Sequence, residues 1–131
     1  MPLELKKLTD IVWPEIKSLL DNEIELLFKS GHKIIVVEAA VLFEANWDEK
    51  MNETWVVFVP KEEAIKRATQ RDNQSIERVK NILDSQLSNK ERISKANVVF
   101  CSVWEREYTI KQVKKAWNLL IERTCKKNSK L

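Results

Sequence analysis

Three runs of consecutive apolar, mostly β-branched residues constrain the fold of this chain most strongly. They are KIIVV at Lys33–Val37, WVVFV at Trp55–Val59 and NVVFCSV at Asn97–Val103. Apolar and polar residues do not alternate within them, a pattern typical of strands covered on both faces, as in parallel sheets. The segments between the runs have helical periodicity. Strands separated by helices predict an α/β fold with a parallel sheet, its strands near residues 33–38, 55–60 and 97–103.

Helices are expected at the N-terminus, between the strands and after the last strand. Pro14 interrupts the first periodic segment, which predicts a short helix at Leu3–Val12 and a longer one that begins at Pro14. Gly31 is expected to end that second helix. The remaining helices are predicted at Lys61–Arg71, at Ser75–Leu87 and at about Thr109–Arg123. The last of them is expected to face inward with its apolar residues, Ile110, Val113, Trp117, Leu120 and Ile121.

Composition limits the classes of protein to which the chain can belong. Its 131 residues are 44% hydrophobic and carry a net charge of +3, which fits one domain of modest core and no strong polyanion binder. The basic excess after Lys111 favours a solvated helix and a basic tail at 125–131, and no nucleic-acid motif accompanies it. Two cysteines, no signal peptide and no membrane-span-length apolar segment predict a cytoplasmic or mitochondrial protein, with Cys101 buried and inert.

Gly31 is the only glycine, and this restricts phosphate chemistry. Loops that surround phosphate with backbone N–H groups need glycines, and the pattern G-x-x-x-x-G-K-[ST] needs two. The 131 residues therefore contain no loop of that kind.

The carboxyl end of the first run presents candidate acidic groups. Ligands of open parallel sheets bind beyond the carboxyl ends of the strands. Glu38 follows KIIVV directly and could hold Mg²⁺ or its water, or could equally serve as a capping or salt-bridging carboxylate. Glu44 closes the same stretch, EAAVLFE, where an ion pair on a helix is the alternative.

Basic and aromatic residues follow the other two runs. Arg67 and Arg71 are four residues apart on one helix face, where they could contact a base and phosphates or simply pair with neighbouring acids. The loop Ser102–Trp104 could contact an adenine, or Trp104 could pack in the core. Lys90 and Arg92 would approach phosphates if the preceding helix folds back as a lid, although an ordinary charged turn gives the same sequence.

These strand ends, in this order, resemble the dephospho-CoA kinase family, in particular the kinase half of the animal bifunctional coenzyme A synthase. The resemblance covers about residues 5–124. It rests on LTDIVWPEI (Leu8–Ile16), VVEAAVLFEANW (Val36–Trp47), VVFVPKEEAIKRATQRD (Val56–Asp72) and SQLSNKERISKANVVFCSVW (Ser85–Trp104).

The resemblance implies an incomplete three-layer P-loop nucleotide-kinase fold, in which residues 1–124 form one domain and residues 67–92 its helical lid. It also implies transfer of the γ-phosphoryl group of ATP, with Mg²⁺, to the ribose 3′-hydroxyl of dephospho-CoA. By the resemblance, the lid residues over the phosphates are Arg71, Lys90 and Arg92. The adenine side consists of Arg67, Ser102, Val103 and Trp104. The substrate side consists of Glu38, Leu42 and Glu44, with Glu38 also near the metal.

The chain departs from the family pattern in several places. The first strand, the P-loop and the catalytic Asp of the family have no counterpart in these 131 residues, and Asn97 replaces a frequent Asp. We therefore expect a homologue that lacks the P-loop part and is inactive alone. The alternatives are a non-catalytic interaction module, which would associate with itself or a partner through an exposed sheet edge, and a fragment of another nucleoside monophosphate kinase.

Overall fold

A computed structural model describes residues 2–126, with side chains as far as Thr124. The chain divides into two compact units, Met1–Met51 and Asn52–Leu131, and each is described by itself. The predicted single domain over residues 1–124 therefore stays a prediction. The expected basic tail at 125–131 lies largely outside the described residues.

The first unit begins with one long helix, α1 (Leu3–Lys29), which continues through Pro14 without a break. The predicted division into two helices is wrong. Proline removes only one backbone hydrogen bond, and the half-buried helix face runs on past it through Lys17, Leu20 and Ile24. Gly31 ends the helix as expected. At φ +92° its N–H donates to Phe28 O at 3.0 Å and the next N–H donates to Leu27 O, which is a Schellman motif.

The segment after α1 corrects the predicted first strand. Residues 33–39 form no strand, although four apolar residues follow Lys33. A strand exists only by pairing with a neighbour, and the described part of this unit contains no other strand. Turns and the 3-10 helix η1 (Trp47–Lys50) follow, and Phe43 and Trp47, 7% and 6% exposed, form the buried centre of the unit.

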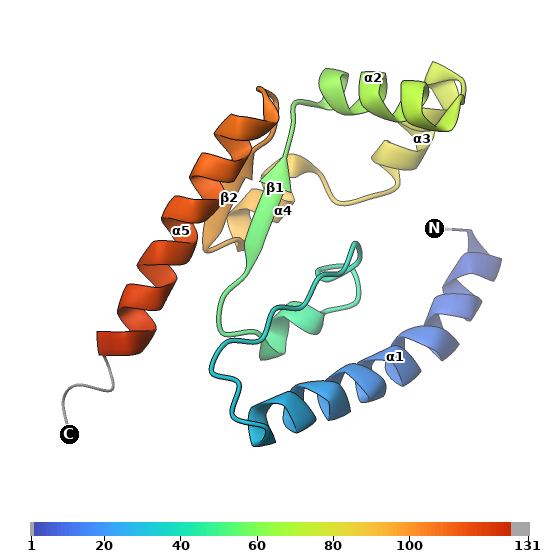
Figure 1. Ribbon diagram of the computed structural model, residues 1–131. Coiled ribbons are helices and arrows are strands. Elements are labelled where there is room, and N and C mark those ends of the chain that lie inside the picture. The colour runs from blue at the N-terminus through green and yellow to red at the C-terminus, as the bar shows by residue number, and fades with distance from the viewer. Residues whose placement is uncertain (1, 127–131) are drawn as a thin grey trace. The chain divides into compact units, whose positions relative to one another are not determined.

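The second unit is built around two parallel strands, β1 (Trp55–Phe58) and β2 (Val98–Cys101). Both predicted runs are confirmed as strands, in a register that places Trp55 opposite Val98. The last helix, α5 (Arg106–Lys126), lies along β2 (Figure 1). Val56 and Phe100, one from each strand, are buried. The α/β class with a parallel sheet is thus confirmed, with two strands rather than three in the described residues.

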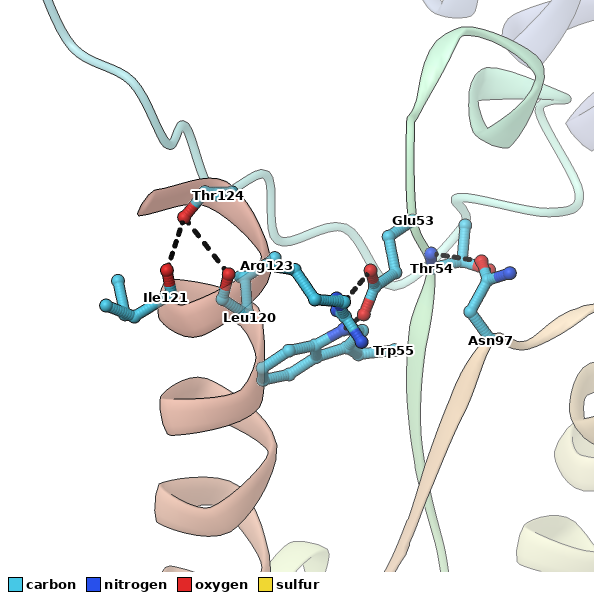
Figure 2. Close-up of polar contacts among 8 residues, drawn as sticks. All are labelled: Glu53, Thr54, Trp55, Asn97, Leu120, Ile121, Arg123 and Thr124. Carbon is cyan, nitrogen blue, oxygen red and sulfur yellow. Dashed lines mark hydrogen bonds and ion pairs between the residues drawn. The ribbon is translucent and has the colours of Figure 1, made fainter. Parts of the chain in front are cut away.

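Polar contacts fix the start of this sheet (Figure 2). The Thr54 N–H donates to Asn97 Oδ1 at 2.8 Å, and the Asn97 N–H donates to Thr54 O at 2.9 Å. Beside them, Glu53 accepts from the Trp55 indole N–H at 2.6 Å and from Arg123 of α5 at 2.8 Å. Because these bonds join β1 to β2 and to α5, they set both the strand register and the position of the last helix.

Three helices connect the strands: α2 (Lys61–Asp72), α3 (Ile76–Asp84) and α4 (Asn89–Lys95). The first two confirm the predictions to within a few residues. Ser75 caps α3 by accepting from the Arg78 N–H at 3.2 Å, and Val79 is the residue of α3 that is buried. α4 was not predicted as a helix. No helix within residues 2–126 has the length and apolar character needed to cross a membrane.

The expected inner face of α5 is only partly covered. Ile110, Val113 and Trp117 are 40%, 37% and 40% exposed, so the prediction that they face a core is wrong for the described structure. A two-stranded sheet is too narrow to cover a full apolar helix stripe.

Candidate functional site

Arg67 joins the two elements expected to form the adenine side. It lies on α2, and its Nη2 donates to Ser102 O at 2.9 Å and to Val103 O at 3.4 Å, beyond the carboxyl end of β2. Its Nε donates to Glu63 Oε1 at 2.7 Å, one helical turn earlier. The structure therefore brings Arg67, Ser102 and Val103 together although 35 residues separate the first two.

This anchoring leaves a specific part of Arg67 available. The bonds to Glu63 and to the loop carbonyls are made by guanidinium N–H groups, which lie in the plane of that group. The side chain is 44% exposed. A planar cation held by its edge can still offer its face to a heteroaromatic ring. Trp104, in the same loop, is 61% exposed, which rules out the alternative that it packs in a core.

Arg71 is occupied by its neighbour. Its Nε and Nη2 donate to the two carboxylate oxygens of Asp72 at 2.7 and 2.8 Å, a bidentate pair on the exposed end of α2. These hydrogen bonds raise the pKa of Arg71 above its ordinary value and lower the pKa of Asp72. The alternative that Arg71 pairs with a local acid is what the structure shows. An anionic ligand would have to displace Asp72 to use this fork.

Lys90 and Arg92 line a hollow of about 460 Å³ at the carboxyl end of β1. Its wall also contains Lys61, which pairs with Asp84 of α3. Asn89 attaches α4 to this strand end by donating from Nδ2 to Val59 O at 2.7 Å. The hollow thus gathers three cationic side chains, together with the carboxylates of Asp84 and Glu91, where ligands of parallel sheets bind.

The start of α4 is fixed by a capping box. The Glu91 N–H donates to Ser88 Oγ at 3.2 Å, and the Ser88 N–H donates to Glu91 Oε2 at 2.8 Å. The Ser88 backbone and side-chain hydrogen bonds lower the pKa of Glu91. The sequence S-N-K-E contains this S-x-x-E signal, which would have distinguished a helix from a charged turn.

The predicted substrate-side residues lie in the first unit, after the segment that forms no strand. Glu38 is exposed, and Leu42 and Glu44 are half-buried in the turns before η1. Leu42 O accepts from the Trp47 N–H at 2.9 Å, which ties this turn to a buried indole. Among the described residues no group of three or more His, Cys, Asp or Glu side chains could hold a metal ion.

One residue that supports the site was missed in the sequence. Gln112 of α5 accepts from the Cys101 N–H at 3.2 Å and donates to Cys101 O at 2.9 Å, so its amide pairs with the last residue of β2 just before the adenine-side loop. Sequence carries no signal for this contact, because it depends on how α5 lies along the strand. Cys101 itself is half-buried, less than predicted.

A parallel sheet with polar side chains gathered beyond the carboxyl ends of its strands is the arrangement of an α/β nucleotide-binding protein. Comparison with known proteins is more specific. The dephospho-CoA kinase family profile matches residues 2–102. The chain therefore belongs to the dephospho-CoA kinase family.

Individual proteins similar to this chain are also dephospho-CoA kinases. The chain is 34% identical to a dephospho-CoA kinase of Dehalococcoides mccartyi over 75% of its length and 50% of that protein's. It is 31% identical to one of Listeria innocua, over 82% of its length and 54% of that protein's. A solved dephospho-CoA kinase from Campylobacter jejuni matches 87% of this chain with 29% identity and a TM-score of 0.60, and 57% of that structure is covered. The chain spans about half the length of the curated relatives it matches.

Proposed function

We propose that these 131 residues supply the adenine side, the lid and part of the acceptor side of a dephospho-CoA kinase. The observation that carries this proposal is the attachment of Arg67 to Ser102 O and Val103 O. It prepares an exposed guanidinium face and the Trp104 loop for the adenine of ATP. Lys90 and Arg92, with Arg71 farther along the lid, would then neutralise the phosphates.

The same proposal holds that these residues do not transfer a phosphoryl group alone. Phosphoryl transfer depends on positioning and on charge stabilisation around the phosphates. The hollow at the end of β1 offers Lys90 and Arg92, but the single glycine excludes a backbone phosphate loop within residues 1–131. Glu38 would contribute one water-mediated contact to Mg²⁺, and the remaining ligands would come from ATP. A segment that carries the missing loop would have to act together with these residues.

Binding and turnover should be measured on the same sample. Calorimetric titrations with Mg-ATP, dephospho-CoA and AMP test recognition, and a coupled ADP-release assay tests turnover. We expect binding of Mg-ATP and dephospho-CoA, weaker binding of AMP as an acceptor, and ADP release at the rate of a protein-free control. Robust turnover by the 131 residues would refute the inactivity, and preference for AMP would favour another nucleoside monophosphate kinase.

A further inference from the structure

One ion pair in the hollow at the carboxyl end of β1 joins α2 to α3. Lys61 is the first residue of α2, and its Nζ donates to Asp84 Oδ1 at 2.5 Å. Asp84 is the last residue of α3, 23 residues farther along the chain. Both side chains line the hollow together with Lys90 and Arg92. The pair therefore places a carboxylate directly on one of the cations that could bind a phosphate.

Asp84 lies where its own helix disfavours a carboxylate. The C-terminal end of a helix carries partial negative charge, so an acidic side chain there is repelled. The last turn of α3 contains no basic side chain that could compensate. Lys61, which comes from the neighbouring helix, supplies the positive charge that offsets this repulsion. The end of α3 is thus stabilised only while Lys61 stays with Asp84.

The pair is open to solvent and can exchange partners. The side chains of Lys61 and Asp84 are 54% and 59% exposed. Exposed ion pairs contribute little to stability, because water and salt screen them. A lysine ammonium has three donors on a flexible stem, so it can turn to another acceptor without a change in the backbone. An anion of higher charge can therefore take Lys61 from the carboxylate.

The other carboxylate of the hollow is held in a different way. Glu91 Oε2 accepts from the Ser88 N–H at 2.8 Å and from the Ser88 hydroxyl at 2.7 Å. These bonds belong to the capping box at the start of α4. Of the two carboxylates, Asp84 can leave its partner without breaking a helix cap.

We propose that Lys61 is a further phosphate-binding residue of this hollow and that Asp84 competes with the phosphates for it, an inference that rests on the proposed function. A polyphosphate that reaches Lys90 and Arg92 takes the Lys61 ammonium from Asp84. Asp84 is then left without its cation at the negative end of α3, so the last turn of that helix loosens. Asp84 thereby weakens polyphosphate binding and couples it to the conformation of α3.

Removal of the competing carboxylate should strengthen binding. Asp84→Asn should lower the Kd of Mg-ATP and of inorganic tripolyphosphate about fivefold, because one exposed ion pair no longer has to be broken. Calorimetric titration measures both values. Glu77→Gln is the matched control, since it removes the same charge from an exposed residue of the same helix outside the hollow. Its Kd values should equal those of wild type. A tighter Kd cannot result from unfolding of the variant.

Combination with Lys61→Gln separates competition from simple repulsion. Lys61→Gln alone should raise both Kd values severalfold. If Asp84 competes for Lys61, then Asp84→Asn should strengthen binding less in Lys61→Gln than in wild type. Repulsion between the Asp84 carboxylate and the phosphates would instead give an equal or larger gain in Lys61→Gln. That result would overturn the proposal.

Hydrogen exchange reports what happens to α3. Tripolyphosphate should accelerate the exchange of the amides at residues 82–85 in wild type and leave the α5 amides unchanged. In Lys61→Gln the amides at 82–85 should already exchange fast and should not respond further. Protection of these amides by tripolyphosphate in wild type would contradict the release of α3.

The outcomes for the two proposals are distinct. Binding of Mg-ATP with equal Kd values for Asp84→Asn and wild type would overturn the competition and leave the proposed function intact. A gain in tripolyphosphate binding by Asp84→Asn, in a chain that does not bind Mg-ATP, would support the competition and refute the proposed adenine side. Binding of neither ligand would refute both proposals.

Discussion

Arg67 shows how one residue can position a loop and present a binding surface. Its Nε and Nη2 make three hydrogen bonds, to Glu63 and to two loop carbonyls, so the guanidinium plane is fixed relative to β2. Lysine has a single ammonium with no planar face, and it cannot reproduce this set of bonds. The geometry, rather than the charge, makes this position suited to a base.

Arg67→Lys should therefore weaken Mg-ATP binding although the charge is kept. Loss of a cation–π contact, about 0.5–2 kcal/mol, corresponds to a roughly twofold to thirtyfold rise in Kd. Calorimetric titration of Mg-ATP measures it, with Arg78→Lys on exposed α3 as the matched control. An unchanged Kd for Arg67→Lys, with the control also unchanged, would remove Arg67 from the adenine site.

At the scale of elements, sequence pattern predicted structure where short-range information was sufficient. The runs at Trp55 and Asn97 became paired strands, and Gly31 ended α1. The run at Lys33 carries the same pattern but forms no strand, because pairing depends on a neighbour that sequence pattern cannot supply. Pro14 failed as a helix boundary because a proline removes only one backbone hydrogen bond from a helix that continues on both sides of it.

The site was predictable to a similar degree. The family resemblance assigned Arg67 and the loop Ser102–Trp104 to one side of the site, and the structure brings Arg67 into contact with the carbonyls of Ser102 and Val103. The bidentate pair of Arg71 with Asp72 had been left as an alternative. A cleft of the first unit, lined by Trp13 of α1 and by Trp47 of η1, was not foreseen. It arises from packing between residues about 30 positions apart in the sequence.

The capping box of α4 leads to a prediction for that element. Ser88→Ala should destabilise α4 by about 1 kcal/mol, because the Glu91 N–H loses its acceptor. Hydrogen exchange of the α4 amides measures the local effect, and exchange should be faster in the variant. Ser94→Ala is the control, since the Ser94 hydroxyl only donates to Glu91 O within the helix.

The destabilisation of α4 by Ser88→Ala should decrease as the pH is lowered. The pKa of Glu91 is lowered in the folded protein. Its contribution to the stability of the folded state is therefore fully present above the ordinary glutamate pKa of about 4.3. This contribution is lost as the pH falls through the lower pKa that Glu91 has in the folded protein. Ser88→Ala keeps the bond from the Ser88 N–H to Glu91 and removes the bond from the Ser88 hydroxyl to Glu91 Oε2 at 2.7 Å. The difference between Ser88→Ala and wild type should therefore be largest at neutral pH and shrink as the Glu91 carboxylate is protonated. A difference that grows on acidification would contradict the capping geometry.

At the scale of the whole chain, apolar surface is incompletely covered within each unit. The buried apolar side chains of the described residues are Phe43, Trp47, Val56, Val79 and Phe100. β1 pairs with β2 along one edge, and no second strand among the described residues pairs with its other edge. Val57, in the middle of β1, is 55% exposed. Exposed apolar strand edges promote association with other chains.

We therefore expect the isolated chain to self-associate at micromolar concentration through this edge. Val57→Lys should reduce the association, because a charge on an edge strand opposes pairing with another strand. Ile76→Lys is the matched control, since Ile76 is also 55% exposed but lies on α3. Sedimentation velocity over a concentration series measures the association. A wild-type monomer with a sharp, cooperative melt would contradict the prediction, and equal effects of both substitutions would locate the association away from β1.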